Sequence, residues 1–300
     1  MTSPREQLVA FRRTAPPTPR LRAHAVQARG LRFAAFTSPP VVDATPLVCV
    51  NGGLLYPHSL LWPALAPLAA KRQLVLYDQR GRGGSEAPPD PQAARIEDDA
   101  GDLPALREAL GIAHWDVLGH SWGGGIAALG TERDQQGTRK LVLVDSVGST
   151  SEWMDGLHEG AARRLTPAGR ARLRRFDRAA MASPDPLVQS AASHAILPAW
   201  LAEPDFSGFV PLPRSTSLTG SAIAARLWRE GYDWSPVFRA VHTPTIVIHG
   251  ERDLLPLTVA HAITRLVPRA SLAVVPEAGH FPFLESPYRF FELVEEFLSP

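Results

Sequence analysis

Short apolar runs recur along the chain, and stretches with helical periodicity separate them. These runs are four to six residues long and rich in Val, Ile and Leu: PLVCV (46–50), QLVLYD (73–78), WDVLGH (115–120), KLVLVD (140–145), TIVIHG (245–250) and LAVVPE (272–277). Strands of a parallel sheet are covered on both faces, so they form continuous apolar runs rather than alternating ones. The pattern therefore predicts a mainly parallel sheet whose strands are buried on both faces.

Helical stretches lie between and after these runs, notably 95–111 (RIEDDAGDLPALREALG) and 286–298 (SPYRFFELVEEFL). In the second stretch, apolar residues recur at i, i+3, i+4 and i+7, which defines one helix face: Phe290, Leu293, Val294 and Phe297. The opposite face carries Glu292, Glu295 and Glu296. Strands alternating with helices predict an α/β fold with helices on both sides of the sheet.

The N-terminal part of the chain has a different character. Residues 1–20 are rich in Arg, Pro and Thr, and they predict an arm with a short helix from Arg5 to Arg13. From Leu21 to Phe36, apolar and polar residues alternate around Arg29-Gly30, which predicts a β-hairpin.

The segment 146–244 interrupts the alternation, because it contains no apolar strand run. It carries Arg-rich helical stretches and many prolines, and a structureless loop of about 100 residues is implausible inside a compact domain. We therefore predict an inserted helical cap at 146–244 over a core formed by 21–145 and 245–300.

Composition and charge narrow the class of protein. The chain is 45% hydrophobic and 20% charged with a net charge of +1, which gives no reason to expect nucleic acid or an anionic membrane as a partner. Cys49 is the single cysteine and lies in an apolar run, so we expect a buried thiol without a disulfide. The N-terminus lacks the apolar segment of a secretory signal, and no run is long enough to cross a bilayer, so a cytoplasmic location is expected.

Candidate chemistry appears in VLGHSWGGG (117–125), where Ser121 follows a predicted strand and precedes a predicted helix. Gly-x-Ser-x-Gly in this context is typical of a nucleophile elbow, a sharp strained turn whose neighbours must be small. Gly119 and Gly123 provide that space, and Gly124 lets the helix approach the sheet. The turn places the serine hydroxyl at the carboxyl edge of the sheet, where open α/β folds bind ligands.

A serine hydroxyl needs a base, and that base needs an orienting carboxylate. Asp253 follows the strand TIVIHG, and His280 follows LAVVPE, so the order Ser, Asp, His matches a triad on successive strand ends. Asp145, at the end of KLVLVD, is an alternative acid. No histidines have metal-ligand spacing, so no metal is expected.

These motifs, GHSWGG, GERD and AGHFPFLE, resemble the nucleophile, acid and base regions of the α/β-hydrolase superfamily, over the span from Leu21 to Pro300. The predicted insertion lies where that family carries its cap. The segment YDQRGRGGS (77–85) is similar to the corresponding loop of the proline iminopeptidases and related serine hydrolases. The resemblance implies an α/β-hydrolase fold and no cofactor.

The resemblance also implies an oxyanion hole made of backbone N–H groups. The family usually has His-Gly, often followed by Gly-Pro, where this chain has NGGLLYPHSLLW (51–62). Gly53 and Trp122 are the expected donors, with Leu54 as the alternative to Gly53. Asn51 replaces the histidine and Leu54 the proline, which weakens the assignment as an aminopeptidase.

The implied activity is hydrolysis of a small ester, lactone or amide through an acyl-enzyme on Ser121, with a small molecule or short peptide as substrate. In proline iminopeptidases, cap carboxylates surround the free amine of the substrate, and the available ones here are Glu152, Glu159, Glu203 and Glu230. Two other functions remain open: a lyase or cyclase of the same fold, favoured by Asn51, and a non-catalytic binding protein, disfavoured by the complete triad.

Several other residues have both a functional and an ordinary interpretation. The cap arginines form either a site for an anionic substrate or, as we favour, a solvated helix face: Arg163, Arg164, Arg170, Arg172, Arg174, Arg175 and Arg178. Bulky aromatic residues of the cap either line an apolar pocket or belong to the core: Trp153, Trp200, Trp228, Trp234 and Phe206. We expect His120 and His249 to have packing roles, whereas His58 lies either at the pocket mouth or on the surface.

Overall fold

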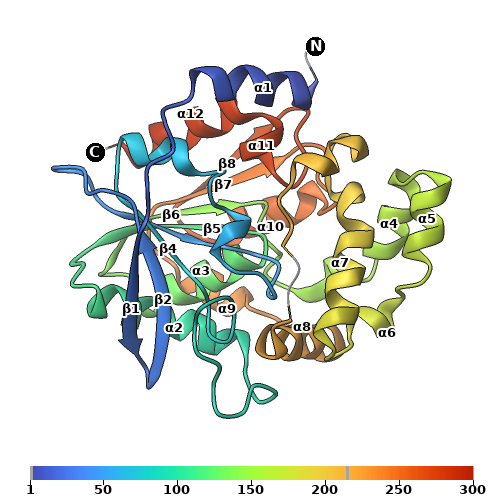
Figure 1. The fold of residues 1–300 in the computed structure, drawn as a ribbon, viewed down its shortest axis with the longest axis horizontal. Coiled ribbons are helices and arrows are strands. Elements are labelled where there is room, and N and C mark those ends of the chain that lie inside the picture. The colour runs from blue at the N-terminus through green and yellow to red at the C-terminus, as the bar shows by residue number, and fades with distance from the viewer. Residues whose placement is uncertain (1–2, 214–215, 300) are drawn as a thin grey trace.

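A computed structural model of the chain describes residues 3–213 and 216–299, which form an eight-stranded sheet with the order β1-β2-β4-β3-β5-β6-β7-β8 (Figure 1). The strands are β1 (Arg22–Ala28), β2 (Leu31–Thr37), β3 (Leu47–Val50), β4 (Leu74–Tyr77), β5 (Trp115–His120), β6 (Thr138–Val144), β7 (Thr245–Gly250) and β8 (Ala270–Val275). Among the named strands of the described residues, the β1–β2 and β2–β4 pairings are antiparallel and the other five are parallel. The prediction of a mainly parallel sheet is confirmed.

The central strands are buried on both faces, as their apolar runs predicted. Every residue of β3, β4, β5 and β7 is buried. The same prediction is wrong for the last strand, because β8 lies at the edge of the sheet and pairs with β7 alone. Five of its six residues are half-buried or exposed, and only Val275 is buried.

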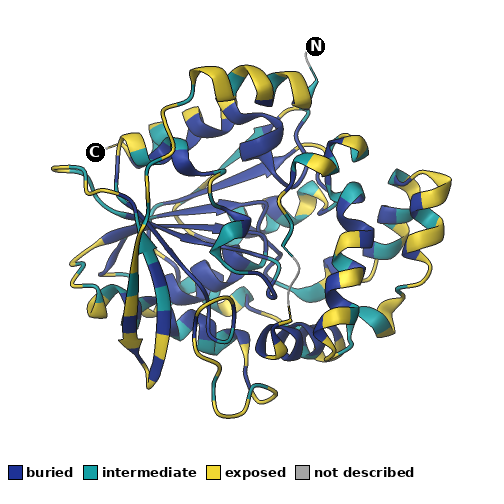
Figure 2. Ribbon diagram, viewed as in Figure 1, coloured by how far each residue is buried: buried dark blue, intermediate teal, exposed yellow. Residues whose placement is uncertain are grey.

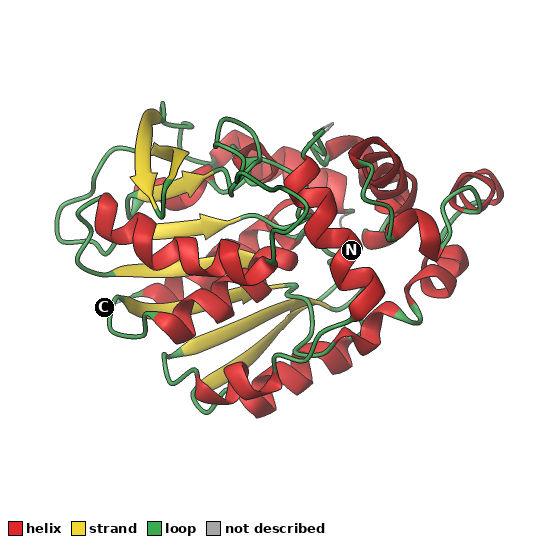
Figure 3. Ribbon diagram, turned by 90° about the horizontal axis from the view of Figure 1, so that it is seen from below, coloured by secondary structure: helices red, strands yellow, loops and turns green. Residues whose placement is uncertain are grey.

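Helices cover both faces of the sheet (Figure 3). Helices α2 (Ile96–Ala109) and α3 (Trp122–Arg133) pack against each other, and α3 lies along β5 and β6. Helix α10 (Leu257–Leu266) packs against β7 and β8. Helices α11 (Pro282–Glu285) and α12 (Pro287–Leu298) complete the C-terminal part of the fold. The arrangement confirms that helices flank the sheet, and it brings the loops after β5, β7 and β8 to one edge.

The N-terminal segment forms helix α1 (Pro4–Thr14), where the sequence predicted a helix from Arg5 to Arg13. Ser3 caps the helix by accepting from the Glu6 N–H group, and the Glu6 carboxylate accepts from the Ser3 N–H group. The helix packs on α11 and α12, where Phe11 stacks on Phe291 with ring centroids 5.2 Å apart. The arm is therefore held against the C-terminal helices (Figure 1).

The first two strands form the predicted hairpin. They turn at Arg29 and Gly30, whose φ angles of 46° and 76° are typical of a two-residue turn that matches the twist of the strands. The polar face of this hairpin is exposed, while alternate residues such as Phe33 are buried against the core (Figure 2).

Between β6 and β7 the chain forms helices and no named strand in the described residues. They are η3 (Ser151–Met154), α4 (Leu157–Arg164), α5 (Pro167–Leu173), α6 (Arg178–Met181), α7 (Pro186–Trp200), η4 (Pro204–Phe209), α8 (Leu218–Glu230) and α9 (Ser235–Ala240). Helices α4 to α8 lie together beside the sheet (Figure 1), whereas α9 packs against α3 and α10. The boundaries of the cap, 146 and 244, stay a prediction.

Two short 3-10 helices, η1 (His58–Leu60) and η2 (Ala66–Ala70), connect β3 to β4. Among the described residues, no helix combines the length and the apolar character needed to cross a membrane.

Candidate active site

Ser121 lies at a strained turn between β5 and α3. Its φ of 56° and ψ of −125° form a conformation that L-residues rarely adopt. A Cβ atom on Gly119 would collide with the carbonyl oxygen of Gly123, and one on Gly123 would collide with that of Val50. The glycines on either side of Ser121 are therefore required by backbone contacts, as the elbow motif predicted.

The acidic and basic residues of the predicted triad come together at the same edge of the sheet. Asp253 follows β7 and His280 follows β8, and His280 Nδ1 lies 2.8 Å from Asp253 Oδ2. The other carboxylate oxygen of Asp253 accepts the Leu255 N–H group at 3.2 Å. Because the Nδ1–H group of His280 donates a hydrogen bond to Asp253, the Nε2 atom carries no hydrogen and can act as a base.

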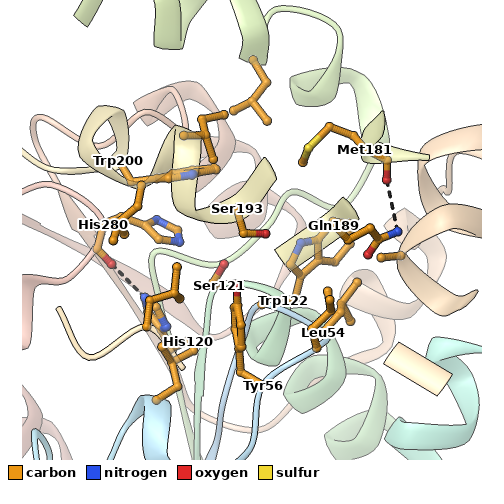
Figure 4. A pocket seen from close by; sticks show the side chains of 18 of the residues that line it. Leu54, Tyr56, His120, Ser121, Trp122, Met181, Gln189, Ser193, Trp200 and His280 are labelled. Atoms are coloured by element: carbon orange, nitrogen blue, oxygen red, sulfur yellow. Dashed lines mark hydrogen bonds between the residues drawn. The ribbon is translucent and has the colours of Figure 1, made fainter. Parts of the chain in front are cut away.

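Ser121 and His280 line the same pocket, and the close-up shows the His280 ring beside the Ser121 side chain (Figure 4). No hydrogen bond joins Ser121 Oγ to the His280 ring among the residues that the structure describes. Catalytic hydrogen bonds are often long before substrate binds and tighten in the complex. Proton transfer between the two side chains therefore requires that they come within hydrogen-bond distance when substrate binds.

Burial sets the electrostatics of this pair. Desolvation lowers the pKa of His280 to about 3 and raises the pKa of Asp253 well above its ordinary range. An imidazole that resists protonation remains neutral around pH 7, which is the form that accepts a proton. The side chain of His280 also contacts the Trp200 ring, with centroids 4.4 Å apart.

The expected oxyanion donors lie around Ser121. A Cβ atom on Gly52 would lie 2.6 Å from Ser121 Cβ and 3.2 Å from Trp122 N, so the loop after β3 contacts the elbow directly. Gly53 and Leu54 both have positive φ angles, of 77° and 53°. Within the described residues, the N–H groups of Gly53, Leu54 and Trp122 donate to no other protein group. All three remain available, and the choice between Gly53 and Leu54 stays open.

Polar residues of the segment 77–85 hold this loop in place. Gln79 Nε2 donates to Asn51 O at 2.8 Å, and Asn51 Nδ2 donates to Tyr56 O at 2.8 Å. Arg82 Nε donates to Leu54 O at 2.7 Å, while its guanidinium forms a buried ion pair with Asp99 at 2.8 Å. The resemblance of this segment to the proline iminopeptidases did not predict this supporting role. The signal in the sequence was the run of polar residues beside glycines in this segment, directly after an apolar strand run.

The pocket above Ser121 is mainly apolar and has a volume of about 110 Å³. Its aromatic walls include Trp122, Trp153, Trp200 and Trp228. Polar groups come from Tyr56, Gln189 and Ser193, which the close-up labels (Figure 4). Among the described residues that line it, none is Asp, Glu, Lys or Arg. Of the aromatic residues singled out in the sequence, Trp234 and Phe206 do not line the pocket, and both are buried elsewhere.

The charged residues of the cap that were singled out in the sequence lie outside the pocket. The four candidate carboxylates are all exposed: Glu152, Glu159, Glu203 and Glu230. Of the seven arginines singled out in the sequence, Arg164 and Arg170 are half-buried and the other five are exposed. Arg164 donates to the carbonyls of Ala199, Arg252 and Asp253, so it supports the loop that carries the acid.

Three other residues singled out in the sequence have structural rather than catalytic surroundings: His120, His58 and Cys49. His120 Nε2 donates to His280 O at 2.8 Å, and burial lowers the pKa of His120 to about 3. His58 lies 2.8 Å from Asp78 and stacks on Phe36, outside the pocket. Burial raises the pKa of the Cys49 thiol to about 12, which makes it unreactive.

One group of donor atoms has the spacing of a metal site. Oxygen and nitrogen atoms of Asp145, His249 and Asp253 lie within 4.8 Å of one another. Both oxygens of Asp253 already accept hydrogen bonds, and Asp145 Oδ1 accepts the Gly250 N–H group at 2.8 Å. Too few free donor atoms remain for a metal ion, so we do not assign these residues as ligands.

Glu285 is a further residue that the sequence analysis missed. It is completely buried and accepts the N–H groups of Ala202 at 2.8 Å and Phe281 at 3.0 Å. Ala202 follows α7 and Phe281 follows His280. The Glu285 carboxyl group therefore connects the cap to the loop that contains His280. Burial raises the pKa of Glu285 to about 7.

Replacing Glu285 by alanine should reduce the free energy of unfolding by about 2–4 kcal/mol, because two buried N–H groups lose their acceptor. Urea denaturation measures the change. Glu292→Ala, on the exposed face of α12, is the matched control and should change stability by less than about 0.5 kcal/mol. Equal stability of the two variants would contradict the role assigned to Glu285.

Known proteins are similar to this chain in sequence and in fold. The family model of the alpha/beta hydrolase fold matches residues 45–287. The chain is 32% identical over 238 residues to 2-hydroxymuconate semialdehyde hydrolase of Pseudomonas putida, covering 76% of this chain and 77% of the relative. It is 27% identical over 262 residues to proline iminopeptidase of Lactiplantibacillus plantarum, covering 81% and 88%. The crystal structure of VinJ superposes with a TM-score of 0.74 at 23% identity, covering 94% of this chain and 99% of that one.

Proposed function

The chain belongs to the α/β-hydrolase family and is a hydrolase-type enzyme, and on that basis we propose that it cleaves an uncharged ester or lactone through an acyl-enzyme on Ser121. The observation that carries the proposal is the 2.8 Å contact between His280 and Asp253 in the uncharged pocket that Ser121 lines. The substrate is a small molecule, and no cofactor takes part.

The mechanism that we propose assigns each step to one of these groups. His280 Nε2 removes the hydroxyl proton of Ser121 while Ser121 Oγ bonds to the carbonyl carbon of the substrate. The N–H groups of Trp122 and Gly53, or Leu54 in its place, stabilise the resulting oxyanion. His280 then gives its proton to the leaving alcohol oxygen as the C–O bond breaks. Water attacks the acyl-enzyme by the same route and restores the Ser121 hydroxyl.

Asp253 has an electrostatic and a geometric role in this scheme. Its carboxylate accepts the Nδ1 hydrogen of His280, which holds the ring in the tautomer with a free Nε2. The same negative charge stabilises the imidazolium that forms when His280 takes the serine proton. Arg164 supports this loop through the Asp253 carbonyl at 2.7 Å.

The lining of the pocket favours a neutral substrate. A substrate with a free amine would bring an ammonium group into a site without a lining carboxylate, and a buried charge without a partner is strongly unfavourable. An anionic substrate meets the same difficulty, because none of the described lining residues is Lys or Arg. An ester or lactone of an apolar acid has neither problem, and its acyl group can pack against Trp153 and Trp228.

The first test compares substrates. We expect kcat/KM for aryl esters of small apolar acids to exceed that for proline arylamides by about 100-fold or more, because the uncompensated ammonium costs several kcal/mol. Initial rates with both series, at one pH and enzyme concentration, measure the ratio. A preference for the arylamide would contradict the neutral substrate and favour an N-terminal-residue amide instead.

A fluorophosphonate, with the adduct located by mass spectrometry, tests the covalent step separately. The expected adduct lies on the peptide that contains Ser121. Folded protein that neither turns over esters nor forms an adduct would contradict the proposal. That outcome would favour the lyase or cyclase chemistry that the same fold supports.

A further inference from the structure

Asp145 is a second carboxyl group beside the acid of the triad. It follows β6, has a φ of 42°, and is completely buried. Its Oδ1 accepts the Gly250 N–H group at 2.8 Å, whereas its Oδ2 is buried with no hydrogen-bond partner among the described residues. A buried carboxylate oxygen without a donor destabilises the ionised form of Asp145. The surroundings of the carboxyl group therefore decide whether it is protonated.

The groups that surround Asp145 do not neutralise a negative charge. Asp253 and His249 have atoms within 4.8 Å of the Asp145 carboxyl group. His249 Nε2 lies 3.1 Å from the Leu255 carbonyl and must be the protonated nitrogen, so Nδ1 presents a lone pair to Asp145 Oδ1 at 3.6 Å. Burial lowers the pKa of His249 to about 4, which keeps its ring neutral.

Other charged groups near the pair lie on neighbouring elements. Glu285 of α11 adds a third buried carboxyl group, and it acts on both aspartates. Arg164 of α4 is near Asp253, but its guanidinium donates to backbone carbonyls. Two carboxylates that share a dry site cannot both be ionised, so Asp145 and Asp253 hold one proton between them.

The hydrogen bonds decide which carboxyl group carries that proton. Asp253 accepts from two donors, His280 Nδ1–H and the Leu255 N–H group, and both stabilise its anion. Asp145 accepts from one donor and has an unpaired oxygen. A hydrogen on Asp145 removes the unpaired oxygen, and the side-chain contact between the two aspartates supplies Asp253 with a further donor. Burial and the charge of Asp253 both raise the pKa of Asp145 well above its ordinary range.

We propose that Asp145 is a positioning residue that stays protonated and donates its hydrogen to Asp253, which keeps Asp253 as the anion that orients His280. The inference rests on the proposed function for the role of Asp253, but the protonation of Asp145 is measurable in protein without any activity. A carboxyl group donating to a carboxylate forms one of the stronger hydrogen bonds in proteins.

An infrared difference spectrum between the wild type and Asp145→Asn at pH 8 tests the protonation state directly. The wild type should show the carbonyl band of a neutral carboxylic acid, and the variant should lack it. The control is Asp134→Asn, whose carboxylate is paired with Arg107 at 2.7 Å and whose difference spectrum should show the loss of an ionised carboxylate. Loss of an ionised band in Asp145→Asn would overturn the proposal.

The variants also separate positioning from packing. Asparagine at position 145 keeps a hydrogen donor and adds no charge, so Asp145→Asn should keep kcat/KM for the ester and the acid limb of its pH profile. Asp145→Ala removes the donor and should lower kcat about 10-fold with little change in KM. If Asp145 were an anion, its removal would lower the pKa of His280 and move the acid limb to lower pH, which would contradict the proposal. Full activity of Asp145→Ala would contradict the positioning role.

A measurement on the wild type keeps the test decisive if these variants fail to fold. In protein labelled with 13C at the aspartate carboxyl carbons, one resonance at pH 8 should have the shift of a neutral acid. It should keep this shift while exposed aspartates titrate. Ionised shifts for all the aspartates at pH 8 would overturn the proposal. Failure of the proposed function itself would instead appear as absent turnover in the wild type, with the neutral acid still present.

Discussion

Ser121→Ala is expected to lower kcat/KM for a neutral aryl ester by about 10⁴-fold or more, because it removes the hydroxyl on which the proposed acyl-enzyme forms. His280 and Asp253 contribute to the rate only by acting on that hydroxyl. The folded state should be little affected, since the Ser121 hydroxyl forms no hydrogen bond within the described residues. The midpoint of urea denaturation should therefore match the wild type.

The matched control for this variant is Ser146→Ala. Ser146 is also buried and follows the neighbouring strand β6, but its hydroxyl donates to the Val147 carbonyl and does not line the pocket. The variant Ser146→Ala should keep most of the ester hydrolysis and should still form the fluorophosphonate adduct. The variant Ser121→Ala should lose both. Hydrolysis by Ser121→Ala within ten-fold of the wild type would show that another residue carries the reaction.

Gly123→Ala is expected to have the largest effect on stability. The added methyl group would overlap the carbonyl oxygen of Val50 and lie 2.8 Å from the carbonyl carbon of Asn51. Neither contact can be relieved by a side chain, so α3 has to move away from β3. We expect the free energy of unfolding to fall by about 3 kcal/mol, at the upper end of the usual cost of overpacking.

The same displacement should impair catalysis. Trp122 N–H and Ser121 lie at the start of α3, and a shift of about 1 Å in catalytic geometry lowers rates about 100-fold. Gly208→Ala is the control, because a Cβ atom there would meet nothing within 4 Å. Urea denaturation and ester hydrolysis measure both effects. A Gly123→Ala variant as stable and active as Gly208→Ala would contradict the close packing of α3 on β3.

The order of motifs along the chain predicted where the candidate site lies. Parallel strands joined by right-handed crossovers place their carboxyl ends at one edge, so residues that follow different strands meet there. Ser121, Asp253 and His280 were found in this way, and the structure places all three at that edge. Asp145 follows a strand as well, and strand order could not separate it from Asp253. The contact between His280 and Asp253 makes the distinction.

Residues that support the site were much harder to predict. These residues form hydrogen bonds with backbone groups that lie far away in the sequence or belong to another element, as Glu285, Gln79 and Arg164 do. Such contacts have no periodicity and no fixed spacing. The exposed edge of β8 was mispredicted for a related reason, because an apolar run shows that a strand is buried but not how many neighbours cover it.

The local sequence pattern was enough to predict the strands, the elbow and the order of the three triad candidates. Apolar runs, glycine spacing and strand ends are all properties of adjacent residues. The uncharged lining of the pocket and the sharing of a proton by Asp145 and Asp253 came from tertiary structure alone. Both depend on which side chains the packed helices and loops exclude from water, and burial of this kind is a property of distances in space rather than of neighbours along the chain.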